Sequence, residues 1–298
     1  MESALDQKTG QIIDGEQLWY INPVDKEGYI CRGCGTLVDP VSYEPHNKIR
    51  PHFKEYRKHP HEPWCNVDGE EKLVARGRKQ RLTTFDGFPG SYPSVLQLTD
   101  ERRIADENSY QADSSHITSR RDKVVRKVVN QQHSSCWTAR TIRPISRTYM
   151  NFPHDRDLAL SISNISGKTY AEVIQKLPSS KIILTNEVKI FAAPISWSKP
   201  QELNECIIVE LGCGLWADNK LLDPYKVVID TSEWGIAKKN YVLKEIDVAR
   251  REAIERNRKG RKNEKSWLFF LATQHPNNPS NFLLNDHRLI CCLTGVMK

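Results

Sequence analysis

The sequence has no long hydrophobic run and few cysteines. No uninterrupted apolar stretch approaches the roughly 18–20 residues that a bilayer-spanning helix requires. The first residues, Met1–Lys8, also lack the apolar segment of a secretory signal. The 8 cysteines are spread over 298 residues, whereas a disulfide framework concentrates them in a smaller chain. These absences predict a cytoplasmic protein with reduced thiols and no membrane partner.

The sequence also lacks a recognisable catalytic constellation. Ser166-Gly167-Lys168-Thr169 ends like a phosphate-binding loop, but Ile162 stands where that loop needs its first glycine. Asp230, Glu233 and Asp286-His287 have side chains found in nuclease centres, but their spacing does not require them to converge. We therefore assign no catalytic residue and expect a binding protein rather than an enzyme.

The charge balance is moderately basic, with 44 lysines and arginines against 37 acidic residues and a formal net charge of +7. Such a surplus favours an anionic partner. We expect nucleic acid, DNA rather than RNA. A protein partner is the alternative. The hydrophobic fraction of 38% is ordinary for a globular protein, and the length is sufficient for two domains.

The composition changes twice along the chain. Residues 1–67 are predicted to form a zinc finger with an N-terminal extension, in which 11–13 and 18–21 have strand-like composition. Residues 68–150 are polar, basic and rich in turn-forming residues, and predict a basic connector with one helix over 119–129. Residues 151–298 are predicted to form a C-terminal domain.

Strand-forming residues dominate this C-terminal part from about residue 180. We predict strands over 181–194, 206–211 and 225–230, a helix over 242–258, and strands over 267–271 and 282–292. The order β-β-β-α-β-β is that of an OB-fold, a five-stranded barrel with a helix between its third and fourth strands. The predicted class is thus α+β: a small zinc finger, a basic helical connector and a mixed C-terminal domain, with an OB-like barrel as one arrangement that fits the order.

Two short pairs of soft ligands lie in the first part of the chain. Cys31 and Cys34 have the spacing of a metal knuckle, and Cys65 forms a second pair with a preceding histidine. His61 gives the compact pair with Cys65, and His59 and His52 are alternatives. Four protein ligands leave no open position for water, so the sequence predicts a structural zinc site.

The same residues carry a resemblance. Tyr29-Ile30-Cys31-Arg32-Gly33-Cys34-Gly35, Pro51-His52-Phe53, His61 and Cys65 resemble the N-terminal finger of competence-protein CoiA-like proteins, and similar fingers open zinc-ribbon proteins of bacterial integrative elements. The resemblance covers residues 28–67. Glu55 departs from the family pattern, which has a histidine at that position. The resemblance also implies a restriction-endonuclease-like domain, but Gly212, after Glu210, stands where its active site needs Gln or Lys.

Basic side chains gather in three places. One cluster follows the finger, a second lies on the expected connector helix over 119–129, and a third ends the long C-terminal helix. The residues that we predict to contact phosphates are Arg76, Arg78, Lys79, Arg81, Arg256, Arg258, Arg261 and Lys262. Any one cluster is more often a solvated surface than a binding site, but three clusters around a zinc finger favour phosphate contacts. Trp197, Trp216 and Trp234 are candidates for stacking on bases, with core packing as the alternative.

These observations favour a non-catalytic, zinc-finger nucleic-acid-binding protein of a bacterial mobile element or antiviral defence system. One alternative is a CoiA-like metal-dependent nuclease whose centre lies in the C-terminal domain. Another is an adaptor that docks a partner protein within a larger complex.

Overall fold

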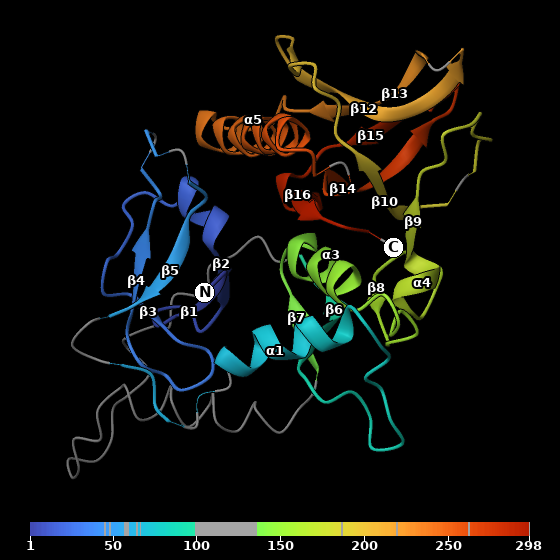
Figure 1. Ribbon diagram of the computed structural model, residues 1–298. Helices are drawn as coiled ribbons and strands as arrows, with labels where there is room; N and C mark the ends of the chain where they lie inside the picture. Colours follow the sequence, from blue (N-terminus) through green and yellow to red (C-terminus); the bar gives the residue numbers. More distant parts are fainter. Residues whose placement is uncertain are drawn as a thin grey trace. The chain divides into compact units, whose positions relative to one another are not determined.

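The computed structural model describes residues 1–44, 46–47, 49–56, 60–63, 65, 67–98, 136–185, 187–218, 220–261 and 263–297. Four α-helices and four separate sheets form within these ranges, so the mixed α+β class is confirmed (Figure 1). No helix in the described ranges combines the length and apolar character needed to cross a membrane. The expected helix over 119–129 lies outside the described residues.

The chain forms two compact units, which are described separately. The first unit consists of the described residues of 1–76 and 84–91 together with Cys136. The second consists of the described residues of 77–83, 92–98 and 137–297. The first unit has a three-stranded sheet in the order β2-β1-β3 and a two-stranded hairpin of β4 and β5. Its elements are β1 (Ser3–Asp6), β2 (Ile12–Asp14), η1 (Gly15–Trp19), β3 (Tyr29–Ile30), β4 (Val38–Val41), β5 (His52–Glu55) and α1 (Val67–Gly77).

The core of the first unit is small and includes two cysteines. Leu18, Tyr29 and Phe53 are buried together with Cys31 and Cys34, and the rings of Tyr29 and Phe53 lie 5.1 Å apart. So few apolar side chains supply little stabilisation by themselves. A cross-link through the cysteines would therefore contribute much of the stability of this unit.

The second unit begins with a minor sheet in the order β7-β6-β8. The elements of this part are β6 (Tyr92–Leu96), β7 (Cys136–Ala139), α3 (Ile142–Asn151), β8 (Ser161–Ile162) and α4 (Tyr170–Val173). Asp155 is buried, and its carboxylate accepts the backbone N–H groups of Leu82 and Thr83 at 2.7–3.1 Å. Asp155 thereby fixes the chain that follows α1 to the second unit.

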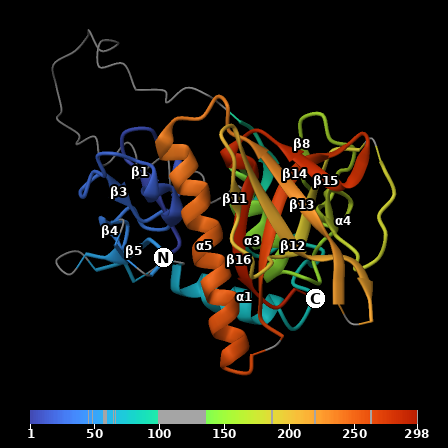
Figure 2. The ribbon, with the colours of Figure 1, turned by 90° about the horizontal axis from the view of Figure 1, so that it is seen from above.

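Most of the second unit is an eight-stranded sheet, in the order β11-β12-β13-β15-β14-β10-β9 with β16 on β14. Its elements are β9 (Ile174–Lys176), β10 (Lys189–Pro194), β11 (Gln201–Glu202), β12 (Cys206–Ala217), β13 (Lys220–Asp230), α5 (Ile236–Arg258), β14 (Lys265–His275), β15 (Asn278–Leu284), η2 (His287–Leu289) and β16 (Ile290–Gly295). Figure 2 shows β12, β13, β14 and β15 together with α5 along one side of them. Helix α5 packs against β14 and β16.

Five of these strands pair in a ring. β10 pairs with β14, β14 with β15, β13 with β12, and β13 runs parallel to β15. An antiparallel bridge between Ile195, just after β10, and Leu211 of β12 completes the circuit. The interior holds aromatic rings from four of the strands: Phe191, Tyr225, Phe270 and Phe282, with the Phe191 and Phe282 centroids 4.7 Å apart.

Three local expectations differ from the structure. The strand expected over 181–194 begins at Lys189, because Gln274 holds the preceding segment through Thr185 and the carbonyl of Ile183. The strand expected over 18–21 is instead η1, because Asp14 and Gln17 form a capping box at its start. The final strand expected over 282–292 is split into β15 and β16 by η2.

Candidate metal centre

The first pair of candidate ligands lies in a tight turn after β3. The Gly35 N–H donates to the carbonyl of Cys31 at 2.8 Å, and the Cys31 N–H donates to the carbonyl of Thr36 at 2.7 Å. The Gly33 N–H points at the sulfur of Cys31, 3.3 Å away. Gly35 has a positive φ of 73°, which a side chain would oppose. The glycines of this segment therefore let the chain turn so that both sulfurs face the same side.

The second pair follows β5. The Cys65 N–H donates to the carbonyl of Glu62 at 2.8 Å, which forms a turn between His61 and Cys65. Glu55, at the end of β5, accepts the backbone N–H of His61 at 3.0 Å. Glu55 therefore fixes the segment that carries His61.

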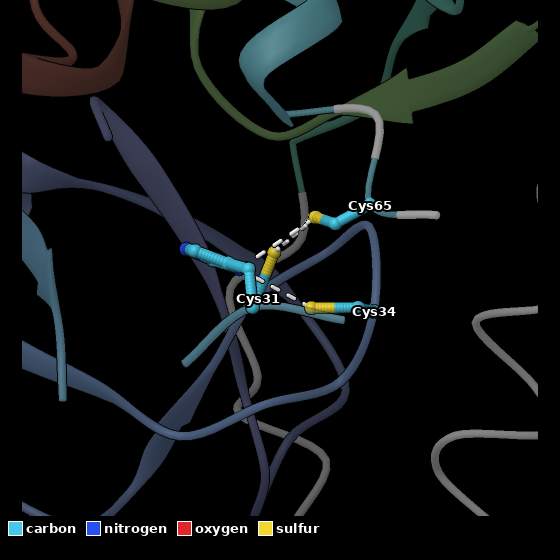
Figure 3. A group of neighbouring side chains, drawn as sticks. Cys31, Cys34 and Cys65 are labelled. Atoms are coloured by element: carbon cyan, nitrogen blue, oxygen red, sulfur yellow. Dashed lines mark hydrogen bonds between the residues drawn. The ribbon is translucent and has the colours of Figure 1, made fainter. Parts of the chain in front are cut away.

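The two pairs converge. The ligand atoms of Cys31, Cys34, His61 and Cys65 all lie within 4.8 Å of one another, so these residues could hold a metal ion. Figure 3 shows the three sulfurs turned toward a common point. The sulfurs of Cys31 and Cys65 are 3.7 Å apart, and Nδ1 of His61 lies 3.2 Å from the sulfur of Cys34 and 3.6 Å from that of Cys65. A tetrahedral site with metal–sulfur bonds of about 2.3 Å has edges of about 3.8 Å between sulfurs. The spacing of the donors thus fits tetrahedral coordination.

The thiols differ in their readiness to ionise. Burial raises the pKa of Cys31 to about 12. Burial also opposes ionisation of Cys34, but its hydrogen bonds with Thr36 and His61 outweigh that effect and lower its pKa to about 6. A bound cation favours the thiolate form of every ligand. Metal binding at neutral pH would therefore displace the proton of the buried Cys31 thiol.

A charged pair lies beside the knuckle. Both terminal oxygens of Glu70, on α1, accept the guanidinium of Arg32 at 2.5 Å. One guanidinium nitrogen of Arg32 makes both contacts, which link α1 to the segment between the two cysteines. The side chains are partly exposed, so the pair orients the helix more than it stabilises the unit.

Of the two alternative histidines, His52 and His59, the structure describes only His52. His52 is not part of the cluster, and its Nδ1 pairs with the carbonyl of Arg50 at 3.1 Å. His59 lies outside the described residues. Among the three histidines considered from the sequence, the structure brings His61 to the cysteines.

The basic residues that follow the finger are exposed, and two of them contact other side chains. Arg78 donates to the side-chain carbonyl of Asn151 at 2.8 Å, and Arg81 pairs with Asp157. Arg76, in the last turn of α1, and Lys79 are exposed. The partner of Arg81 lies far along the chain, so the sequence pattern could not reveal it.

The basic end of α5 is also partly neutralised. Glu264 pairs with Arg256 and lies 3.8 Å from Arg261. Arg258 is exposed, and Lys262 lies outside the described residues. Acidic neighbours therefore reduce the positive charge that the sequence pattern suggested for this end of the helix.

The three tryptophans differ in exposure. Trp197 and Trp216 are 54% and 44% exposed, and so are free to contact a ligand. The indole N–H of Trp234 donates to the carbonyl of Asn285, and its ring packs edge-on against His287.

No protein-family model, curated protein or solved structure matches this chain.

Proposed function

We propose that Cys31, Cys34, His61 and Cys65 bind one structural zinc ion. The observation that carries this proposal is the convergence of four soft donors within 4.8 Å of one another. Three thiolates and an imidazole are a typical structural zinc set. The ion would supply a cross-link between the β3 knuckle and the segment after β5. With all four positions taken by protein, this site has no vacancy for substrate or water, and its role is architectural. The resemblance to CoiA-like fingers supports the same assignment.

For the second unit we propose an OB-type barrel. The ring of β10, β12, β13, β15 and β14 has the strand order of that fold, including a parallel pair between its third and fifth strands. Helix α5 lies between the third and fourth ring strands in the sequence, as it does in OB-folds. This argument is an analogy at the level of the fold.

On this basis we propose a non-catalytic nucleic-acid-binding protein, with DNA as the favoured ligand. OB-folds commonly bind oligonucleotides, and the chain carries a net charge of +7. Residues 1–76 contain more acidic than basic residues, so the basic surplus comes from the rest of the chain. We therefore assign the phosphate contacts to residues beyond the finger, and the finger to support. A role in a mobile element or defence system belongs to the same proposal and rests on the resemblance alone.

The test combines metal analysis with binding. Purified protein is expected to contain one zinc per chain by atomic spectroscopy. Fluorescence anisotropy with labelled single-stranded and duplex oligonucleotides, over a salt series, should give an affinity that falls steeply with salt. The exposed residues Lys79 and Arg258, changed to glutamine, should each reduce the salt slope by about one contact. Lys26→Gln, an exposed charge in the acidic unit, is the matched control and should leave the slope unchanged.

Two results would contradict these proposals separately. Absence of stoichiometric zinc overturns the metal assignment and leaves the binding question open to the anisotropy data. Absence of binding at low salt overturns the nucleic-acid assignment. Metal-dependent cleavage of the same oligonucleotides would replace it with the nuclease alternative.

A further inference from the structure

The hairpin of β12 and β13 extends past its neighbours in the sheet. β15 pairs with β13 from Lys226 onward, and the bridge to β12 is at Leu211. Beyond those points the two strands pair with each other, as far as the described residues show. We call the described residues of 214–224 the arm. Its outer backbone edges therefore resemble edge strands, which tend to associate with other chains.

Large apolar side chains are exposed on and beside the arm. On the arm, Leu215 and Trp216 are 45% and 44% exposed and Leu222 is 61% exposed. The pairings Leu215–Asp223 and Trp216–Leu221 leave Leu222 as the extra residue of a bulge, without a direct cross-strand partner.

The loop between β9 and β10 lies next to the arm in both views (Figures 1 and 2). A hydrogen bond from the hydroxyl of Tyr225 to the carbonyl of Ser180 ties the start of this loop to the base of the arm. The loop exposes Ile183 to 80% and also exposes Leu184. An apolar concentration of this kind is characteristic of an interaction site.

The charges of the arm are self-complementary. Lys220-Leu221-Leu222-Asp223 places a cation and an anion at equal distances from the Leu221–Leu222 bond. Both charged side chains are exposed, and neither forms an ion pair with another residue in the described ranges. If two such segments lie antiparallel about a two-fold axis through that bond, Lys220 of each copy faces Asp223 of the other. Opposite charges at facing positions of antiparallel strands stabilise the pair.

We propose that the arm is a self-association surface, whose occupant is the arm of a second copy of this chain. The two-fold arrangement brings Leu221 and Leu222 of both copies to the centre, with a Lys220–Asp223 pair at each end, as an isologous contact requires. Pro224 has no N–H to donate, so strand-to-strand pairing ends there and stays short. A nucleic acid would not be favoured at this surface, because Asp218 and Asp223 outnumber Lys220. This inference is independent of the zinc and nucleic-acid proposals.

The experiment uses the full chain in sedimentation-velocity or light-scattering measurements over a concentration series. Lys220→Asp places anions at both facing positions, 220 and 223, and Asp223→Lys places cations at both. Each should raise the dimer dissociation constant about tenfold or more. The double variant K220D/D223K restores the symmetry with reversed signs and should dimerise like the unaltered chain. A mixture of the two single variants should form heterodimers. Lys199→Asp, the same charge change on an exposed loop, is the control.

Each outcome decides the proposal. Rescue by the double variant and heterodimer formation support it. A chain that stays monomeric at about 100 μM overturns it. A dimer whose dissociation constant is the same in the single variants also overturns it, because the contact then lies elsewhere. An equal effect of Lys199→Asp overturns it as well, because dimerisation then depends on net charge. Circular dichroism and thermal unfolding of each variant distinguish loss of dimerisation from loss of the folded state.

Discussion

The buried pair of Arg143 and Glu245 allows a quantitative prediction for the second unit. The two side chains are 2% and 3% exposed, and they connect α3 to α5. The same oxygen of Glu245 also accepts the backbone N–H of Cys292 at 2.6 Å, and Arg143 donates to the carbonyl of Cys292 at 3.2 Å. The pair therefore joins two helices to β16.

Replacing Arg143 with methionine keeps most of the side-chain volume and removes the charge. The carboxylate of Glu245 would then stay buried without its cation. Leaving one member of a buried pair alone costs about 3–5 kcal/mol, so Arg143→Met is expected to lower the free energy of unfolding of the second unit by that amount. Glu245→Gln alone should cost a comparable amount, because the Arg143 guanidinium then stays buried without its anion, although the amide oxygen can still accept a hydrogen bond. The double variant should recover part of the loss from Arg143→Met, because its core contains no unpaired charge.

Urea denaturation followed by far-ultraviolet circular dichroism measures all four proteins of this cycle. The coupling energy is the difference between the double variant and the sum of the singles. Glu255→Gln, which breaks an exposed pair with Lys259 at the end of α5, is the control and should leave the urea midpoint nearly unchanged. If Arg143→Met costs less than about 1 kcal/mol, or the singles simply add, the reasoning from burial is wrong.

Three further predictions concern the metal centre and a buried histidine. Cys34→Ser should lose the metal and unfold the first unit, and a chelator should do the same to the unaltered protein; full stability after chelation would argue against this. Glu55→Ala, which releases the backbone of His61, should weaken metal affinity about tenfold in a competition with a chromogenic chelator, whereas Glu44→Ala in the same unit should not. Burial lowers the pKa of His287 from 6.5 to about 4, so the unfolded chain binds the extra proton between these values and stability falls as pH decreases from 6.5 toward 4, by up to about 3 kcal/mol. His287→Gln should flatten this part of a pH series of urea midpoints, and an unchanged slope would refute the assignment.

The convergence of the candidate ligand cysteines was predictable because their spacing is local. Cys31 and Cys34 bracket a turn whose glycines are visible in the sequence, and His61 and Cys65 are separated by one turn. From the sequence His52 was the second choice after His61, because it lies farther from Cys65 but beside Phe53. The structure brings Nδ1 of His61 to the sulfurs of Cys34 and Cys65, whereas Nδ1 of His52 pairs with the carbonyl of Arg50.

The strands of the second unit were predictable for the same reason, since β-branched and aromatic residues dominate them. Their pairings were not. Arg143 and Glu245 are 102 residues apart, and each resembles an ordinary charged helix residue in the sequence. Likewise, the partners of Arg81 and Arg256 come from other segments, so charge clusters in sequence overstated the free positive surface.

The ring of strands in the second unit also constrains the order in which the unit can fold. The antiparallel partner of β10 is β14, which follows β12, β13 and α5 in the sequence. β15, which comes later still, pairs in parallel with β13 and lies between β13 and β14. Contacts between such distant segments cost loop-closure entropy before they contribute stability, so they form late and slowly. During synthesis the β12–β13 hairpin therefore forms before the strands that cover its edge. Expression yield should thus depend on temperature and on chaperone supply more steeply than the stability of the finished protein does.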